Sequence, residues 1–158
     1  MRPTGAFVIV LALSGLMVSG VGSVASAQPA PAAPEAVAAC TQFARALDLA
    51  SLSYSDFANA LALGQARPDY SDPTVSSSNT YGRTGLREAV GVALTASRTP
   101  GLAPQIAAPM RSWALSATKL VLLMGLRAGV DRFNHNADQI NGETEAVQKA
   151  CADAGTRA

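Results

Sequence analysis

Apolar residues recur every seven positions along two stretches of the chain, one towards each end. Spacing of this kind places the residues on one stripe of an α-helix. The first stretch covers about residues 35–65, and its stripe holds Cys40, Phe43, Leu47, Ala50, Tyr54, Phe57 and Leu61. The second stretch runs to Cys151 and holds Leu126, Val130, Phe133, Ala137, Ile140, Val147 and Cys151. The serines at 51, 53 and 55 are the weak point of the first helix, where it could kink or restart.

The middle of the chain predicts a long polar loop and two further helical segments. Residues 66–82 are rich in Pro, Ser, Thr and Asp, which compete with regular backbone hydrogen bonds, so we expect a loop that is mobile or functional. A short helix follows over about 84–97, with Thr84 as its cap.

The last helical region begins near Pro109, a residue that suits a first helical position. It is apolar on every side around Leu120–Leu126, so it is either central in a bundle or offers a second face to a partner. We expect one long helix from Pro109 to the end, with an interruption near residues 134–142 as the alternative. Gly125, Gly129 and Gly142 are the places where this helix could bend or break.

The two cysteines, Cys40 and Cys151, begin the first apolar stripe and end the last one. One cysteine pair in an exported protein is most simply one disulfide. That bond makes the first and last helices antiparallel, and about 36 Å of each could then pair along the whole length. The predicted fold is an all-α, small helical bundle with its first and last helices joined by Cys40–Cys151.

The N-terminus predicts export. Arg2 precedes an almost unbroken apolar run over 6–24, and Ala25-Ser-Ala27 offers the small residues of a signal peptidase site. We therefore expect a signal peptide over 1–27, a Pro/Ala spacer over 28–34 and a single helical domain over 35–155. A retained membrane anchor is the alternative, although the run is short for a span. Val37-Ala-Ala-Cys40 resembles a lipobox but lies too far from the apolar run.

Composition excludes some classes of partner. Removing residues 1–27 from the 158 leaves 131 residues, enough for one domain, and leaves 11 Lys+Arg against 11 Asp+Glu because Arg2 is lost. A chain without a basic surplus is not expected to attract nucleic acid or anionic lipid.

The candidate binding residues are few. His135 is the only histidine, and it is either a ligand or base or an exposed polar residue. Without a second histidine, and with both cysteines paired, we expect no metal site, and heme held by His135 is only a weaker alternative. Arg83 and Arg87 could bind an anion at the start of the second helix, or could simply be solvated. Tyrosines at 54, 70 and 81 could contact a ligand or pack the fold.

Motifs for catalysis are missing from the sequence. It has no Gly-x-Ser-x-Gly, no Gly-rich phosphate loop and no His-Glu-x-x-His. Glu143 and Glu145 are two residues apart on a helix and point to different sides, so they do not form an acid/base pair. We therefore expect no catalytic residue, no cofactor and no enzyme activity.

Three segments, Ala39-Cys-Thr-Gln-Phe-Ala44, Ser71-Asp-Pro-Thr-Val-Ser76 and Pro109-Met-Arg-Ser-Trp113, resemble small exported two-cysteine helical proteins of mycobacteria. The resemblance implies a compartment outside the cytoplasm and no catalytic residue. Our first hypothesis is a secreted or envelope-associated protein that acts by contact with an envelope or host macromolecule, and that keeps no membrane span after signal cleavage. The alternative is a carrier of a lipid or other apolar small molecule within the bundle.

Overall fold

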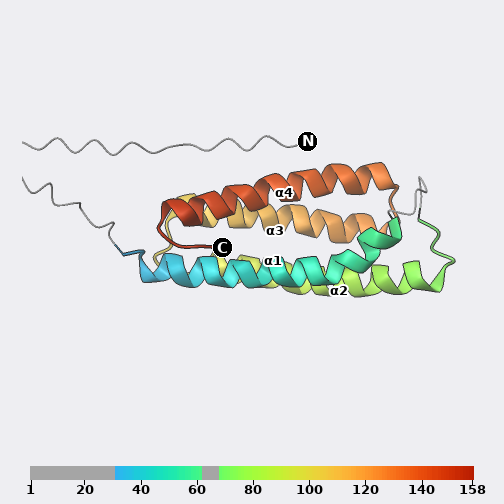
Figure 1. The fold of residues 1–158 in the computed structure, drawn as a ribbon, viewed down its shortest axis with the longest axis horizontal. Coiled ribbons are helices and arrows are strands. Elements are labelled where there is room, and N and C mark those ends of the chain that lie inside the picture. Colours follow the sequence, from blue (N-terminus) through green and yellow to red (C-terminus); the bar gives the residue numbers. More distant parts are fainter. Residues whose placement is uncertain (1–30, 62–67) are drawn as a thin grey trace, which may run out of the picture.

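The computed structural model describes residues 31–61 and 68–158. Over these ranges the chain forms four α-helices, namely α1 (Pro34–Leu61), α2 (Pro73–Ala96), α3 (Pro104–Gly125) and α4 (Val130–Asp153). Two antiparallel hairpins, α1 with α2 and α3 with α4, lie face to face (Figure 1). The predicted all-α bundle is confirmed, and Cys40 of α1 is bonded to Cys151 of α4. The expected signal peptide and the start of the spacer, 28–30, lie outside the described residues.

The predicted loop over 66–82 is wrong from Pro73 onward, because α2 begins there. Residues 66 and 67 of that prediction lie outside the described residues. Asp72 caps the helix by accepting a hydrogen bond from the Thr74 amide at 2.7 Å, and Pro73 takes the first helical position, where no amide is needed. Thr84, the cap expected from the sequence, lies inside the helix.

The serines and threonines of α2 do not disrupt it, because their hydroxyls bond back to helix carbonyls. Ser78 Oγ donates to the Val75 carbonyl at 3.1 Å, and Thr80 Oγ1 donates to the Ser76 carbonyl at 3.0 Å. The same kind of bond occurs in α1, where Ser53 Oγ donates to the Leu49 carbonyl at 2.6 Å. The serines of this stretch are the predicted weak point of the first helix, yet α1 continues to Leu61.

The long final helix is also wrong, because a turn over residues 126–129 separates α3 from α4. Arg127 adopts a left-handed conformation with φ 53°, and the Ala128 amide bonds to the Leu123 carbonyl at 3.0 Å. This is the hydrogen-bond pattern of a Schellman C-cap, in which glycine usually takes the left-handed position. The Arg127 guanidinium lies 5.0 Å from the centre of the Tyr70 ring, which holds the arginine in that turn. The helix α4 then runs unbroken through 134–142.

The interior divides into two clusters of buried side chains. The cluster at the disulfide end contains Phe43 and Trp113, whose rings meet edge to face with centroids 5.3 Å apart. The cluster at the other end contains Phe57 and Phe133, in the same geometry at 5.5 Å. Edge-to-face pairs add to the stability that burial of the rings provides.

Two glycines of α2 allow it to approach α1 closely. A Cβ at Gly82 would lie 3.1 Å from the Ser53 carbonyl oxygen and 2.8 Å from Met124 Cε, and a Cβ at Gly85 would overlap the Ser53 side chain. By contrast, Gly91 on the same helix has open space around it.

We expect Gly85→Ala to lower the free energy of unfolding by about 1–3 kcal/mol, because the new methyl group collides with Ser53 Cβ and Oγ. Gly91→Ala should instead raise it by about 0.5–1 kcal/mol through helix propensity alone. Urea denaturation of both variants checks this, and a stabilised Gly85→Ala protein would show that α1 and α2 are not packed as described.

Candidate binding cleft

The first and last helices of the bundle are neighbours that barely touch. Most of the packing of α1 is against α2, and α4 packs chiefly against α3. The expectation that α1 and α4 pair along their whole length is therefore wrong. They are joined at the disulfide end and at the Phe57–Phe133 end, and a cleft separates them in between.

The cleft has a volume of about 370 Å³ and is lined almost entirely by apolar surface. Such a volume lies within the range of small-molecule sites in proteins. All four helices contribute to its lining, which consists of Leu47, Ala50, Ser51, Tyr54, Ser55, Leu86, Trp113, Ala117, Leu120, Ala137, Ile140, Asn141 and Thr144.

The cleft lies where the side chains along the two heptad stripes do not fill the space between α1 and α4. At the ends of the stripes, side chains such as Phe43, Phe57 and Phe133 are fully buried. In the middle stand Ala50 and Ala137, which are too small to bridge the gap between α1 and α4 and remain partly exposed. The larger middle residues, Leu47, Tyr54 and Ile140, are partly exposed as well and line the gap.

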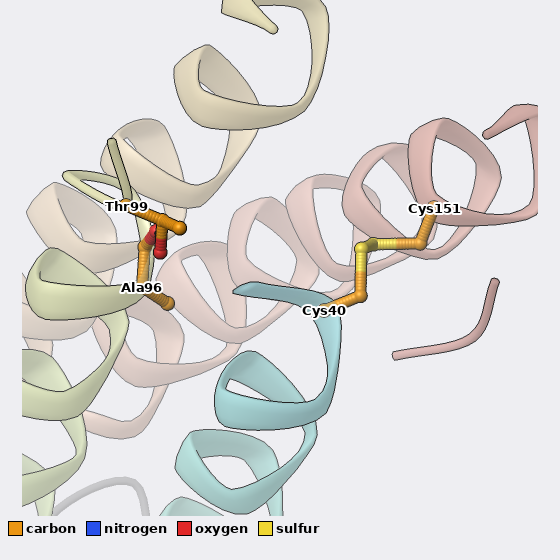
Figure 2. The surroundings of a disulfide bond; sticks show 4 residues. All are labelled: Cys40, Ala96, Thr99 and Cys151. Carbon is orange, nitrogen blue, oxygen red and sulfur yellow. A yellow bond between two sulfur atoms is a disulfide. The ribbon is translucent and has the colours of Figure 1, made fainter. Parts of the chain in front are cut away.

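The disulfide closes one end of the cleft. Figure 2 shows Cys40, near the start of α1, bonded to Cys151, near the end of α4. Both residues are inaccessible to solvent, and their Cα atoms are 6.0 Å apart. The C-terminal residues Ala154 and Ala158 pack against the same cluster, so this end of the bundle is sealed.

The polar groups of the cleft are uncharged. The indole Nε1 of Trp113 donates to Thr144 Oγ1 at 3.0 Å, which fixes the ring in the wall. Ser51, Ser55 and Asn141 are exposed at the rim, and the lining contains no Asp, Glu, Lys, Arg or His. Such a surface suits an apolar molecule with at most a neutral polar end.

Tyr54 is the titratable group of the lining. Burial raises its pKa to about 12, and the nearby Tyr70 hydroxyl adds to the shift. The cleft is therefore uncharged at any physiological pH.

The raised pKa of Tyr54 has a consequence at alkaline pH. The unfolded tyrosine ionises near pH 10 and the folded one near pH 12, so stability is fully present below pH 10 and falls as pH rises between the two values. We expect ionisation of Tyr54 to remove about 2 kcal/mol from the free energy of unfolding over this window. Tyr54→Phe should lack this component when both proteins are unfolded with urea at pH 9.5 and 11.5. An equal loss of unfolding free energy in the two proteins would mean that the Tyr54 side chain is exposed to water rather than buried.

Most residues singled out from the sequence lie away from the cleft. His135 is exposed on α4, Tyr81 is 76% exposed, and Tyr70 packs on Phe57 and under Arg127. The arginines at 83 and 87 stand inside α2 rather than at its start.

The two glutamates expected to point apart do so. Glu143 Oε1 accepts from Ser116 Oγ at 2.9 Å, whereas Glu145 is exposed. Over residues 31–61 and 68–158, no cluster of three or more His, Cys, Asp or Glu is placed to hold a metal ion. No helix within these same ranges is both long enough and apolar enough to cross a membrane.

Sequence reasoning identified most of the apolar wall but missed the rim and the gap itself. Ser51, Ser55, Asn141 and Thr144 were not recognised as site residues. The signal available in the sequence is their position, since these small or polar side chains interrupt or flank the middle of both heptad stripes.

Comparison with known protein families gives a match over most of the chain. The model of the Rv2240c four-helix bundle domain matches residues 23–152, which is most of the chain. The match agrees with the four helices found here and with the resemblance to helical proteins of mycobacteria. No curated protein and no solved structure matches the chain.

Proposed function

The chain belongs to the Rv2240c four-helix bundle domain family, and we propose that it uses this fold to hold an apolar small molecule in the cleft between α1 and α4. The observation that carries the proposal is the cleft of about 370 Å³. Its wall is apolar and uncharged, and it contains the aromatic rings of Tyr54 and Trp113. Medium-length alkyl chains or small neutral lipids have the chemistry that such a wall accepts.

The proposed role is non-catalytic. The hydroxyls that line the cleft, on Ser51, Ser55, Tyr54 and Thr144, have no histidine or carboxylate in the lining that could act as their base. The exposed position of His135, outside the lining, argues against heme held in the cleft.

We place this role outside the cytoplasm. A disulfide persists in oxidising compartments, and the apolar run that ends at Ala27 has the pattern of an export signal. Mass spectrometry of the protein from its host should find Gln28 as the first residue and the two-hydrogen mass loss of a disulfide. A chain that retains Met1 and free thiols would contradict this placement.

Native mass spectrometry also tests the binding role. The protein purified from its host should carry an apolar molecule, and Ala137→Phe should lose it because the new ring fills the cleft. Ala146→Phe, which adds the same ring to an exposed position of α4, is the control and should keep the molecule. Repeated preparations without any bound molecule, or equal occupancy in both variants, would contradict the proposal.

Contact with another macromolecule is a second candidate function, and a different surface supports it. The apolar segment 120–126 was expected to offer a second face, and the structure buries Leu120, Val121 and Met124 but leaves Leu122 and Leu126 exposed. Leu115 and Leu122 of α3, and Leu126 at its C-terminal cap, face solvent.

A further inference from the structure

Acidic and basic residues are unevenly distributed among the four helices, although their numbers are nearly equal over the chain. Together, α1 and α4 carry eight Asp or Glu against three Lys or Arg, whereas α2 and α3 carry four Lys or Arg against one Glu. Because α1 and α4 border the cleft and α2 packs on α3, the two sets form opposite sides of the bundle. One side is acidic and the other basic.

Exposed leucines lie on the basic side. Leu115, Leu122 and Leu126 are 71%, 61% and 78% exposed. Their spacing of seven and four residues puts the first two on one stripe of α3 and Leu126, the residue that caps α3, in line with them. We call these three residues the leucine stripe. Solvent-exposed apolar side chains gathered on one helix face commonly mark an interaction surface.

Basic side chains flank the leucine stripe. Lys119 lies between Leu115 and Leu122 on the same face, and Arg111 lies one turn before Leu115. Both are exposed, and α3 contains no Asp or Glu. A groove of about 280 Å³ beside the stripe is lined by Arg87 of α2 together with Leu122.

Charge complementarity selects the partner. A two-fold contact between two copies through this side would bring the same basic residues against one another, which is unfavourable. Nucleic acid would pair with the basic residues but would leave the leucines without an apolar contact. An anionic lipid surface satisfies both, since its headgroups attract arginine and lysine while its acyl boundary accepts leucine.

We propose that the basic side of the bundle, formed by α2 and α3 and bearing the leucine stripe, docks this protein on an anionic lipid surface. The acidic side, formed by α1 and α4, then faces away from the lipid. This inference does not depend on a ligand in the cleft. It uses the exposed leucines that also support the second candidate function, but its partner is a lipid surface rather than a macromolecule.

Vesicle sedimentation tests the docking. The oxidised protein purified from its host should bind vesicles of equal parts phosphatidylcholine and phosphatidylglycerol about 10-fold or more tightly than pure phosphatidylcholine vesicles, and raised salt should weaken the binding. Replacing all three residues of the leucine stripe by serine should weaken it by about 10-fold or more. The pair Arg87→Glu and Lys119→Glu should do the same while leaving the leucines in place.

Two substitutions on the acidic side serve as controls. Leu52→Ser removes a leucine that is 76% exposed on α1, and Arg132→Glu reverses an exposed charge on α4. Both should leave vesicle binding unchanged. Absence of binding to the mixed vesicles, or binding that the stripe variant retains, would overturn the inference. The protein could instead self-associate or crosslink to another protein through the leucine stripe without binding vesicles. That result would overturn the proposal of a lipid partner and would support contact with a macromolecule as the function.

Discussion

Removing the Cys40–Cys151 bond is expected to lower the free energy of unfolding by about 4–5 kcal/mol, because the bond closes a loop between residues 111 apart in sequence. The bond is also the tie between α1 and α4 at their end of the bundle, since the two helices otherwise pack on different partners. Its loss should therefore loosen the start of α1 before it affects the α3–α4 hairpin.

Urea unfolding with and without a thiol reductant measures this effect. The doubly substituted Cys40→Ala, Cys151→Ala protein is the control, because its stability should not respond to reductant. Hydrogen exchange should increase first in residues 34–46 of α1. An unchanged urea midpoint after reduction would mean that α1 and α4 are held together by contacts other than those described.

Phe57→Ala should lower the free energy of unfolding by about 3–5 kcal/mol, the usual loss for a buried aromatic ring. Phe57 is fully buried at the end of the cleft opposite to the disulfide. The centroid of its ring is 5.5 Å from the ring centroid of Phe133 of α4, and 6.0 Å and 6.4 Å from those of Tyr54 and Tyr70. The substitution therefore removes the second tie between α1 and α4 and leaves a cavity among three rings.

Leu52→Ala on the same helix is the matched control. Leu52 is 76% exposed, and its truncation should change the free energy of unfolding by no more than about 0.5 kcal/mol. Urea denaturation of the two variants compares them directly. Similar midpoints would show that Phe57 is not the anchor at this end of the bundle.

The sequence predicted the elements whose signals are local and strong. The heptad stripes predicted the first helix and the apolar face of α4, but not the turn before α4. The cysteines at the far ends of the stripes predicted the correct bond. The start of α2 was missed even though Asp72-Pro73 is a standard pair for a helix start. The serines after it favour a loop by composition, whereas in the structure their hydroxyls bond to carbonyls of the preceding turn.

The cleft could not be predicted in the same way. A heptad pattern shows which side of a helix is apolar, but it does not show which neighbour that side meets. Here Gly82 and Gly85 let the backbones of α1 and α2 approach closely, and α1 packs mainly on α2 rather than on α4. That preference arises from packing between distant residues, and the periodicity of α1 and α4 does not contain it.

The most direct measurement of the central claim uses Trp113, the only tryptophan of the chain, which stands in the wall of the cleft. A medium-chain alcohol with a bromine at its far end is a neutral apolar probe that quenches tryptophan on contact. Titrating it should quench Trp113 fluorescence saturably in the native protein and in Ala146→Phe, and should fail to do so in Ala137→Phe. Weak, non-saturating quenching that is the same in all three proteins would contradict the claim that the space between α1 and α4 is a binding site.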